Sequence, residues 1–353
     1  MKLFFSRLMP GLLIVALLAA AGCSDSDDTD GDGFVSRVID SVALAVAENL
    51  QETVLVEETE AEALVVAAVH EYDPTVRAIS DIFIDNDVIY ATADGALIVY
   101  DHSSKSDRIL RSEEPLKAVE KHLGDIYVGG DNLFRLEGDS LVTVDGGMVG
   151  TINTLYSYGP NLMIGTTFGL YSKTVLGFFL LVDEMDITAL VADERGLWVG
   201  TGGQGLYRYD GEEFHPRYLN RDRSLFEYVN CLDFNHDHLY LGTPNGLYIF
   251  DGGRWEELTT AEGLPSDDVR SIDASRWLVS IGTPSGTVSW FNGEFYPVDR
   301  IGEQPVEVVR AMERRIIVGT PDGALVMKSG PVVKTLVQMT PPGEQELAAK
   351  TSF

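Results

Sequence analysis

A short glycine-rich element recurs along the chain and constrains its fold more than any other feature of the sequence. It is clearest as GTPNG at residues 242 to 246, and it returns with substitutions six more times, about 35 to 42 residues apart. A repeat of this length indicates an architecture in which each unit is one small group of secondary-structure elements. The equivalent residues are Ala91, Gly129, Gly165, Gly200, Gly242, Gly282 and Gly319.

Each repeat unit divides into four short segments that have the composition of strands. In the fourth unit these are ITALVAD, GLWVGT, GLYRYD and EFHPRYL, which are rich in β-branched and aromatic residues and are separated by Gly or Asp. Asp-Gly or Asn-Gly pairs, which close tight hairpins, follow the third segment at residues 210, 251 and 292. We therefore predict an all-β chain with a seven-bladed β-propeller over residues 79 to 336, each blade being a four-stranded antiparallel sheet.

The segments on either side of the repeats are less regular. Residues 34 to 78 predict a short helical or irregular segment, because Val35, Val38, Val42 and other apolar residues recur at helical spacing, whereas residues 59 to 72 fit a helix or a strand. The seventh unit supplies four segments of its own, the last at residues 331 to 336. Residues 53 to 56 are an alternative outer strand, so closure of the ring stays open. Residues 337 to 353 predict a flexible tail.

The N-terminus has the layout of a secretory signal. Lys2 and Arg7 precede an apolar stretch at residues 8 to 21, and small residues lead to Cys23. The run AAGC resembles the lipobox of bacterial lipoproteins, which implies that residues 1 to 22 are a signal peptide and that Cys23 is lipidated. An ordinary cleaved signal peptide is the alternative. Ser24 stands where inner-membrane lipoproteins carry Asp, which implies an outer-membrane lipoprotein on the periplasmic side or at the cell surface.

Residues 23 to 33 form an acidic segment that we interpret as a tether. Asp28, Asp30, Asp32 and Gly33 follow the first, third, fifth and sixth positions of a calcium loop. Ile39 occupies the place where such a loop has a bidentate Glu, so the ligand set is incomplete. The segment is therefore either a weak calcium site or a plain solvated linker, and we expect no cofactor except calcium at this site.

The charge balance restricts the kind of partner. The chain has 55 Asp and Glu against 26 Lys and Arg, a net charge of −29, which repels nucleic acid and anionic lipid head groups. We expect no nucleic-acid partner and membrane attachment through the lipid anchor only. There are two cysteines, and lipidation of Cys23 leaves Cys231 as a single free thiol, so the folded body must be held together by its core.

Residues 261 to 272, AEGLPSDDVRSI, lie between two repeat units. Together with GLWVGT they resemble the repeats of the two-component regulator propeller family, which has a Gly-Leu-Pro-Ser turn and a Trp-Ile-Gly-Thr strand. The resemblance implies a propeller of the kind that often forms the outer sensor part of a membrane-spanning histidine kinase. Because this sequence has no second apolar span and no room for a kinase, we expect only the binding module to carry over. The matching residues are Gly263, Leu264, Pro265, Ser266, Trp198, Gly200 and Thr201.

The candidate ligand site lies on one face of the predicted ring. Turns between the second and third strands, GTPNG among them, share this face with the connections between blades, and the longest connection follows residue 219. Its arginines suit carboxylate or phosphate groups, and its aromatic rings offer flat contact area to a sugar or a peptide. Alternatively, the arginines pair with nearby acids and the rings fill the packing between blades. The candidate residues are Arg217, Arg221, Arg223, Phe226 and Tyr228.

Other chemically active residues give weaker signals. His236 and His238 point the same way if they lie on a strand and are then a zinc candidate, although a solvated loop is the alternative. Asp267 and Asp268 sit in the Gly-Leu-Pro-Ser turn, where Asp supplies turn hydrogen bonds. Cys231 lies in an apolar first strand, where a buried and unreactive thiol is expected.

No catalytic constellation is evident in the sequence. The leading interpretation is a non-catalytic lipoprotein whose propeller binds a protein, a peptide or a glycan. One alternative is a polysaccharide lyase or hydrolase with ionisable groups gathered in the central channel. Another is a sensor subunit that works with a separate histidine kinase.

Overall fold

The computed structural model describes the backbone of residues 50 to 57, 64 to 68, 78 to 219, 226 to 235, 237 to 274, 278 to 291, 293 to 298, 304 to 312, 315 to 329 and 332 to 339. The chain forms two units. The unit Glu57–Val332 holds a β-propeller, and the unit of Met1–Val56 with Val333–Phe353 contains the sheet formed by β1 (Leu50–Glu57) and β29 (Val332–Met339). None of the described residues forms a helix that could cross a bilayer.

Six four-stranded antiparallel sheets build most of the propeller, and they confirm the predicted all-β blades. Five of them consist of four consecutive strands, which run from an inner to an outer position. These five sheets comprise β6 (Ala118–His122), β7 (Asp125–Gly129), β8 (Leu133–Glu137) and β9 (Ser140–Thr143); β10 (Ile152–Tyr158), β11 (Asn161–Thr166), β12 (Gly169–Thr174) and β13 (Gly177–Asp183); β14 (Ile187–Asp193), β15 (Gly196–Thr201), β16 (Leu206–Tyr209) and β17 (Phe214–Arg217); β18 (Cys231–Asn235), β19 (His238–Thr243), β20 (Gly246–Phe250) and β21 (Trp255–Leu258); and β22 (Ser271–Ala274), β23 (Val279–Thr283), β24 (Gly286–Phe291) and β25 (Glu294–Pro297).

The sixth four-stranded sheet closes the ring with a strand from the other end of the chain. Its order is β26 (Val308–Met312), β27 (Arg315–Gly319), β28 (Ala324–Ser329) and β2 (Leu64–Ala68), and Leu64 is paired with Met327. The predicted outer segment at residues 331 to 336 instead belongs to β29, which pairs with β1. The alternative in which a segment before the repeats supplies the outer strand is therefore correct. The strand is residues 64 to 68, however, and not residues 53 to 56.

The first repeat unit differs from the others. It forms a three-stranded sheet of β3 (Ile79–Asp85), β4 (Val88–Asp101) and β5 (Ser106–Pro115), so the prediction of seven four-stranded blades is wrong for this unit. The strand β4 is 14 residues long and has a register shift between Asp94 and Ala96. The N–H of His102 donates to the carbonyl of Asp87 at 2.8 Å, so the two ends of β4 lie side by side and the strand turns back on itself near this register shift.

The predicted N-terminal helix is not supported. Within residues 34 to 78 the described parts are the strands β1 and β2 and residue 78, while residues 34 to 49 lie outside the described residues. Leu64 and Val65 belong to residues 59 to 72, which fitted a helix or a strand, and their hydrogen-bonded pairing with β28 favours the strand.

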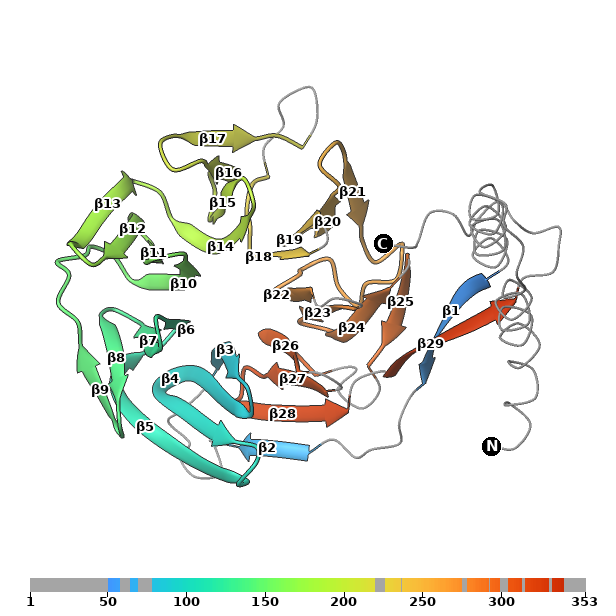
Figure 1. Ribbon diagram of the computed structural model, residues 1–353, viewed down its shortest axis with the longest axis horizontal. Helices are drawn as coiled ribbons and strands as arrows, with labels where there is room; N and C mark the ends of the chain where they lie inside the picture. Colours follow the sequence, from blue (N-terminus) through green and yellow to red (C-terminus); the bar gives the residue numbers. More distant parts are fainter. Residues whose placement is uncertain are drawn as a thin grey trace, which may run out of the picture. The chain divides into compact units, whose positions relative to one another are not determined.

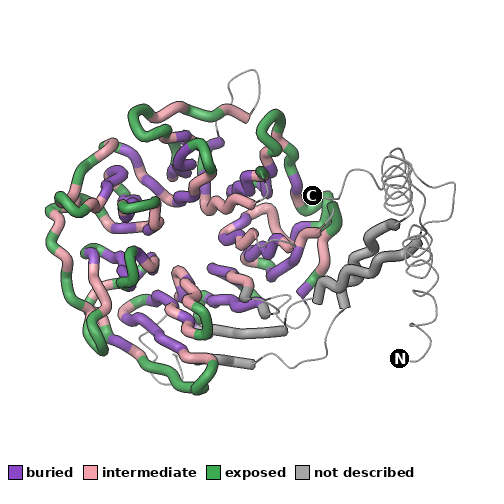
Figure 2. Tube along the Cα trace, in the orientation of Figure 1, coloured by how far each residue is buried: buried purple, intermediate pink, exposed green. Residues whose placement is uncertain are grey.

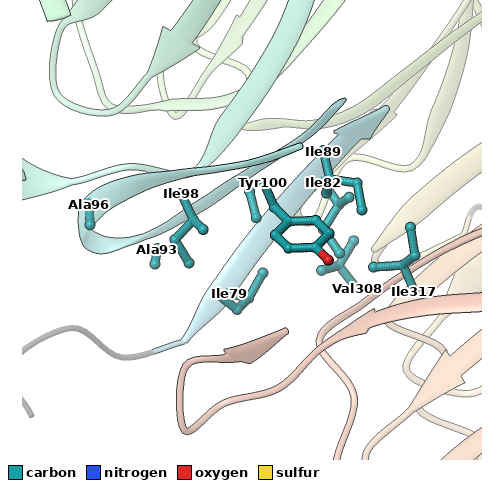
Figure 3. Close-up of a cluster of buried hydrophobic side chains, with 10 residues drawn as sticks. Ile79, Ile82, Ile89, Ala93, Ala96, Ile98, Tyr100, Val308 and Ile317 are labelled. Atoms are coloured by element: carbon teal, nitrogen blue, oxygen red, sulfur yellow. The ribbon is translucent and has the colours of Figure 1, made fainter. Parts of the chain in front are cut away.

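The inner strands meet around the centre of the ring. Successive inner strands contact one another from β3 through β6, β10, β14, β18 and β22 to β26, and β26 contacts β3 (Figure 1). Figure 2 shows exposed residues along the outer rim and buried residues gathered within the sheets. Where the last sheet meets the first, Val308 and Ile317 pack against Ile79, Ile82 and their neighbours (Figure 3). Apolar burial between sheets thus holds the first and last sheets of the ring together.

Both residues of the recurring Gly-Thr pair have a structural role. A Cβ atom on Gly200 would lie 2.4 Å from Cγ1 of Val229, which enters the next sheet, and equivalent contacts occur at other repeat glycines. The hydroxyl of Thr243 donates to the carbonyl of Gly246 at 3.0 Å and accepts from the N–H of Asn245 at 3.0 Å, which holds the turn. Gly246 has a φ of 140°, a conformation that favours glycine. The repeat therefore encodes close packing of sheets and a tight turn.

Candidate functional site

A polar cavity of about 340 Å³ lies at the centre of the ring, lined by residues of the inner strands and of the segments that enter them. The inner strands begin beside the ends of the second strands, as Ile187 does beside Thr201. The lining residues therefore reach the face that carries the second-to-third turns, where the ligand site is predicted, and we call this end of the cavity its entrance. Central cavities of this size with convergent polar groups are common places for ligands.

Seven polar side chains surround this entrance, one from each sheet, and we call them the mouth ring. Each directly precedes the inner-strand residue that pairs with the repeat glycine, or with Thr92 in the first sheet. The mouth ring comprises Ser80, Lys117, Asn153, Thr188, Asn230, Arg270 and Glu307, all of which line the cavity.

Part of the mouth ring is held in place by hydrogen bonds to the next sheet. The amide of Asn153 donates to the carbonyl of Ile187 at 3.1 Å, and that of Asn230 donates to the carbonyl of Val269 at 2.9 Å. Arg270 donates to Asp268 at 3.1 Å and also bonds Glu307. Lys117 is exposed and donates to Asn153 at 3.4 Å. The ring thus presents fixed amides, one braced guanidinium and one exposed ammonium to solvent.

Deeper in the channel, carboxylates connect one inner strand to the next. Asp81 accepts the N–H of Val119 at 3.0 Å, and Asp233 accepts the N–H of Ala274 at 2.6 Å. Glu120 and Asp273 accept backbone N–H groups in the same way from the strands that follow them. These strands are the inner edges of their sheets, so their channel-facing N–H groups need partners, and the carboxylates supply them.

Arg310 is the cation at this depth. Its guanidinium donates to Asp81 at 2.8 Å, to the carbonyl of Ile82 at 3.0 Å and to the carbonyl of Val309 at 2.9 Å. Asp273 and Asp233 also act on it electrostatically. Several acceptors and a paired carboxylate are the arrangement that a half-buried guanidinium charge requires.

The channel shifts the acidity of its carboxyl groups. Burial, with Asp81 nearby, raises the pKa of Glu120 to about 7, and burial raises the pKa of Asp233 to about 6. Burial also raises the pKa of Asp81 and of Asp273. Desolvation disfavours the ionised form of each group more than Arg310 and the hydrogen bonds favour it. Near neutral pH the cavity therefore holds carboxyl groups that gain or lose protons readily.

Cys231 also lines the cavity, with a half-buried side chain. Burial raises the pKa of its thiol, so the thiolate that would act as a nucleophile is not formed near neutral pH. This agrees with the unreactive thiol expected from the sequence.

The three predicted ligand-contact residues that the structure describes have different surroundings. Arg217 lies over the ring of Trp198 at 5.6 Å, and Tyr228 bridges Gly202 near the mouth with 53% of its surface exposed. Phe226 is 4% exposed and packs edge-on against Tyr248 and Trp255, with centroids at 5.1 and 4.9 Å. Phe226 thus fills packing between sheets, the role that the sequence left as the alternative.

Several predicted site residues lie outside the described residues: Arg221 and Arg223, His236, Cys23, and the acidic tether with Asp28, Asp30 and Asp32. In the part of the chain that the structure describes, no group of three His, Cys, Asp or Glu side chains is placed to hold a metal ion. The described partner of the histidine pair, His238, stacks near Tyr240 with ring centroids 6.4 Å apart.

Asp267 and Asp268 make the turn hydrogen bonds expected of them. Asp267 accepts the N–H of Thr260 at 2.7 Å, and Asp268 accepts from Asn230 at 3.2 Å and from Arg270 at 3.1 Å. Through these contacts the Gly-Leu-Pro-Ser turn braces two members of the mouth ring.

Sequence reasoning missed the channel residues, although a signal was present. Three residues after the mouth-ring position, four units carry a charged residue in the inner strand. In a propeller the free edge of each inner strand faces the channel. A charge that recurs at one inner-strand position therefore indicates a channel-lining group. Aligning the first strands of the units would have singled out Glu120, Asp233, Asp273 and Arg310.

Solved structures with a similar fold include two bacterial examples. The extracellular domain of a hybrid two component system from B. thetaiotaomicron matches with a TM-score of 0.61 and 16% identity, over 72% of this chain and 39% of that chain. The extracellular domain of a one component system from the same organism matches with a TM-score of 0.58 and 16% identity, over 79% of this chain and 40% of that chain. This chain thus covers well under half of either structure.

A third similar structure is the WD40 β-propeller domain of Doa1, with a TM-score of 0.55, 13% identity, and coverage of 79% of this chain and 96% of that chain. No protein-family model and no curated protein matches the chain. At these identities the similarity shows a shared propeller fold, while function depends on the particular side chains of the site.

Proposed function

We propose that this chain is a non-catalytic binding module whose ligand, a peptide, a protein segment or a glycan, docks on the mouth ring and reaches into the central cavity. The observation that carries the proposal is the polar cavity of about 340 Å³ with seven convergent polar side chains at its entrance. Amide, hydroxyl and guanidinium groups held by the scaffold can donate to and accept from carbonyl or hydroxyl groups of a ligand. Tyr228 adds an exposed aromatic surface beside the mouth.

The proposed surface includes the connection with Arg221 and Arg223, because it leads directly to Tyr228 and Asn230 along the chain. Arg217 belongs to the same proposal, being exposed at the end of β17 and stacked on Trp198. Guanidinium groups at this rim suit a carboxylate or phosphate on the ligand.

A ligand-capture experiment tests the site. Immobilised wild-type protein is exposed to a native envelope extract, and captured peptides and glycans are identified by mass spectrometry. Lys117→Ala combined with Arg270→Ala should reduce capture about tenfold or more, since losing about 1.4 kcal/mol of binding free energy has that effect. Arg254→Ala is the matched control, because Arg254 is 88% exposed on a surface turn. Capture that is equal in all three proteins would refute the mouth-ring site.

The three-stranded sheet is, in this proposal, the seventh blade. The first half of β4 pairs with β3 and the second half with β5, for example Ala91 with Ile82 and Val99 with Arg108. Gly95, between the two halves, has a φ of 78°, which suits a tight turn. The strand β4 would then combine the second and third strands of an ordinary blade.

The proposal extends to family and location. The GLPS turn and the Gly-Thr strands support membership of the two-component regulator propeller repeats, and the AAGC run supports an outer-membrane lipoprotein anchored at Cys23. The bacterial structures with a similar propeller are extracellular domains of one- and two-component systems. A sensor subunit that works with a separate kinase is therefore a specific form of the binding role.

An enzyme acting on a polysaccharide is the second candidate, and one observation favours it. Glu120, with a pKa of about 7, and Asp233, with a pKa of about 6, line the same cavity, and perturbed carboxyl groups in a cavity are candidates for acid–base catalysis. The binding role is preferred because Glu120 and Asp233 accept backbone N–H groups of neighbouring strands. Cleavage of an envelope glycan by wild-type protein but not by Glu120→Gln would reverse this preference.

A further inference from the structure

Three buried hydroxyl groups share one face of the β22–β25 sheet. Ser280 and Ser289 are 0% exposed and Thr287 is 1% exposed, and none of the three hydroxyl oxygens has a hydrogen-bond partner among the described residues. Ser280 lies directly opposite Ser289 and also opposite Asp273. Directly opposed residues of antiparallel strands point to the same face, so these side chains form one polar surface.

This surface faces the last sheet of the ring. A Cβ atom on Gly282, which pairs with both Ser271 and Thr287, would lie 2.9 Å from Cγ1 of Val306 and 3.6 Å from Cγ1 of Val309. The N–H of Val309 donates to the hydroxyl of Ser271 at 3.0 Å. The hydroxyls therefore point into the interface with β26 and β27, which we call the hydroxyl seam.

The preceding interface has apolar side chains at the same positions. In the β18–β21 sheet the equivalent residues are Tyr240, Leu247 and Ile249, and all three belong to a buried apolar cluster. Tyr, Leu and Ile are thus replaced by Ser, Thr and Ser at the hydroxyl seam.

The opposing side chains do not compensate for the smaller residues. Ile272, Val279 and Ile281 pack against the apolar set, whereas Val309, Ile316 and Val318 stand at the equivalent positions beside the hydroxyl seam. Described side chains of similar size thus face a surface that has become both smaller and polar.

We propose that the hydroxyl seam binds ordered water molecules, which bridge Ser280, Thr287 and Ser289 and are continuous with the water of the central cavity. A buried hydroxyl without a partner costs free energy, and a bridging water removes that cost where two to four polar groups converge. Asp273 lines the cavity and is paired with Ser280, so it connects the seam to the channel and gives water a route of entry.

A pair of Thr→Val substitutions tests the proposal within a single sheet. Val has nearly the shape of Thr, so each change removes mainly the hydroxyl. Thr283 is a 0% exposed residue whose hydroxyl donates to Gly286 at 2.9 Å and accepts from Ser285 at 3.2 Å, so Thr283→Val should lower the urea midpoint of unfolding. If water satisfies the hydroxyl of Thr287, Thr287→Val should lower the midpoint as well.

A different result is expected if the hydroxyl seam contains no water. An unsatisfied hydroxyl destabilises the folded state, so in a dry seam Thr287→Val would leave the midpoint unchanged or raise it while Thr283→Val lowers it. That pattern would overturn the proposal. A crystal structure that resolves ordered water should also show density within hydrogen-bond distance of the Ser280 or Ser289 hydroxyl, and an empty seam or direct Ser280 to Ser289 bonding would likewise overturn it.

Discussion

At the scale of single residues, the channel carboxylates have a structural task and an electrostatic cost. Asp81, Glu120, Asp233 and Asp273 each accept an N–H from a neighbouring inner strand, so they join the sheets where no strand ladder does. Their burial also penalises the ionised form, and Arg310 offsets this cost in part. The strength of these links should therefore depend on pH.

Glu120 makes this dependence measurable. The ordinary pKa of 4.5 is raised to about 7 in the folded protein, so between these values the folded state binds more protons than the unfolded state. The contribution of Glu120 to stability is therefore largest below about pH 4.5 and is lost as the pH rises to about 7. Glu120→Gln keeps an acceptor oxygen without the charge. It should match wild type near pH 5 and exceed its free energy of unfolding by about 2 to 3 kcal/mol at pH 8.

Urea unfolding of wild type and of Glu120→Gln at pH 5 and pH 8 measures the effect. Glu256→Gln, a substitution of an exposed residue, is the control. The charges of Asp81 and Arg310 affect the pKa of Glu120 more than other charges do. Asp233, across the channel, titrates near pH 6, so the stability of wild type depends on pH whether or not Glu120 titrates. A Glu120→Gln protein whose stability relative to wild type is the same at pH 5 and pH 8 would contradict the buried, titrating carboxyl group.

At the scale of strands and sheets, the repeat glycines set the distance between neighbours. The second strand of one sheet lies so close to the entry of the next that a methyl group has no room, as between Gly200 and Val229 or between Gly319 and Ile79. The repeat glycines thus mark a close contact between sheets as well as the predicted turn. It predicted the four-stranded sheets because alternation and hairpin pairs are local, but it did not distinguish β4 from two separate strands.

Gly200→Ala should therefore weaken the packing between the β14–β17 and β18–β21 sheets. The added Cβ would lie 2.4 Å from Cγ1 and 3.0 Å from Cβ of Val229, so the strands must shift. Overpacking of this kind costs about 1 to 3 kcal/mol of unfolding free energy. Thermal and urea unfolding should show the loss, whereas Gly253→Ala, in an exposed turn with its nearest contact at 3.5 Å, should change it by less than about 0.5 kcal/mol. Equal stability of the two variants would argue against glycine-controlled spacing.

At the scale of the whole molecule, a strand from the N-terminal part of the chain closes the propeller. Strand β2 completes the last sheet, so the residues that precede the first sheet are tied into the ring. Residues 1 to 49 lie outside the described residues, and the proposed anchor rests on the sequence alone.

Cys23→Ser should release the protein from the membrane fraction, because Ser cannot form the thioether bond through which a lipoprotein is anchored. Fractionation of cell envelopes checks this, and Cys231→Ser is the matched control, since that thiol lies in the channel and should not affect anchoring. Continued membrane association of Cys23→Ser would exclude lipidation as the means of attachment.

The sequence by itself determined the repeat, its period and the four-stranded character of most units. These features depend on local signals: hairpin pairs, the Gly-Thr turn and alternation along a strand. Only the tertiary structure decided that residues 64 to 68 complete the last sheet and that Phe226 is buried. It also decided that Asp81 of the first sheet and Arg310 of the last sheet meet. These outcomes depend on contacts between residues far apart in the chain, where pairing and burial outweigh local preference.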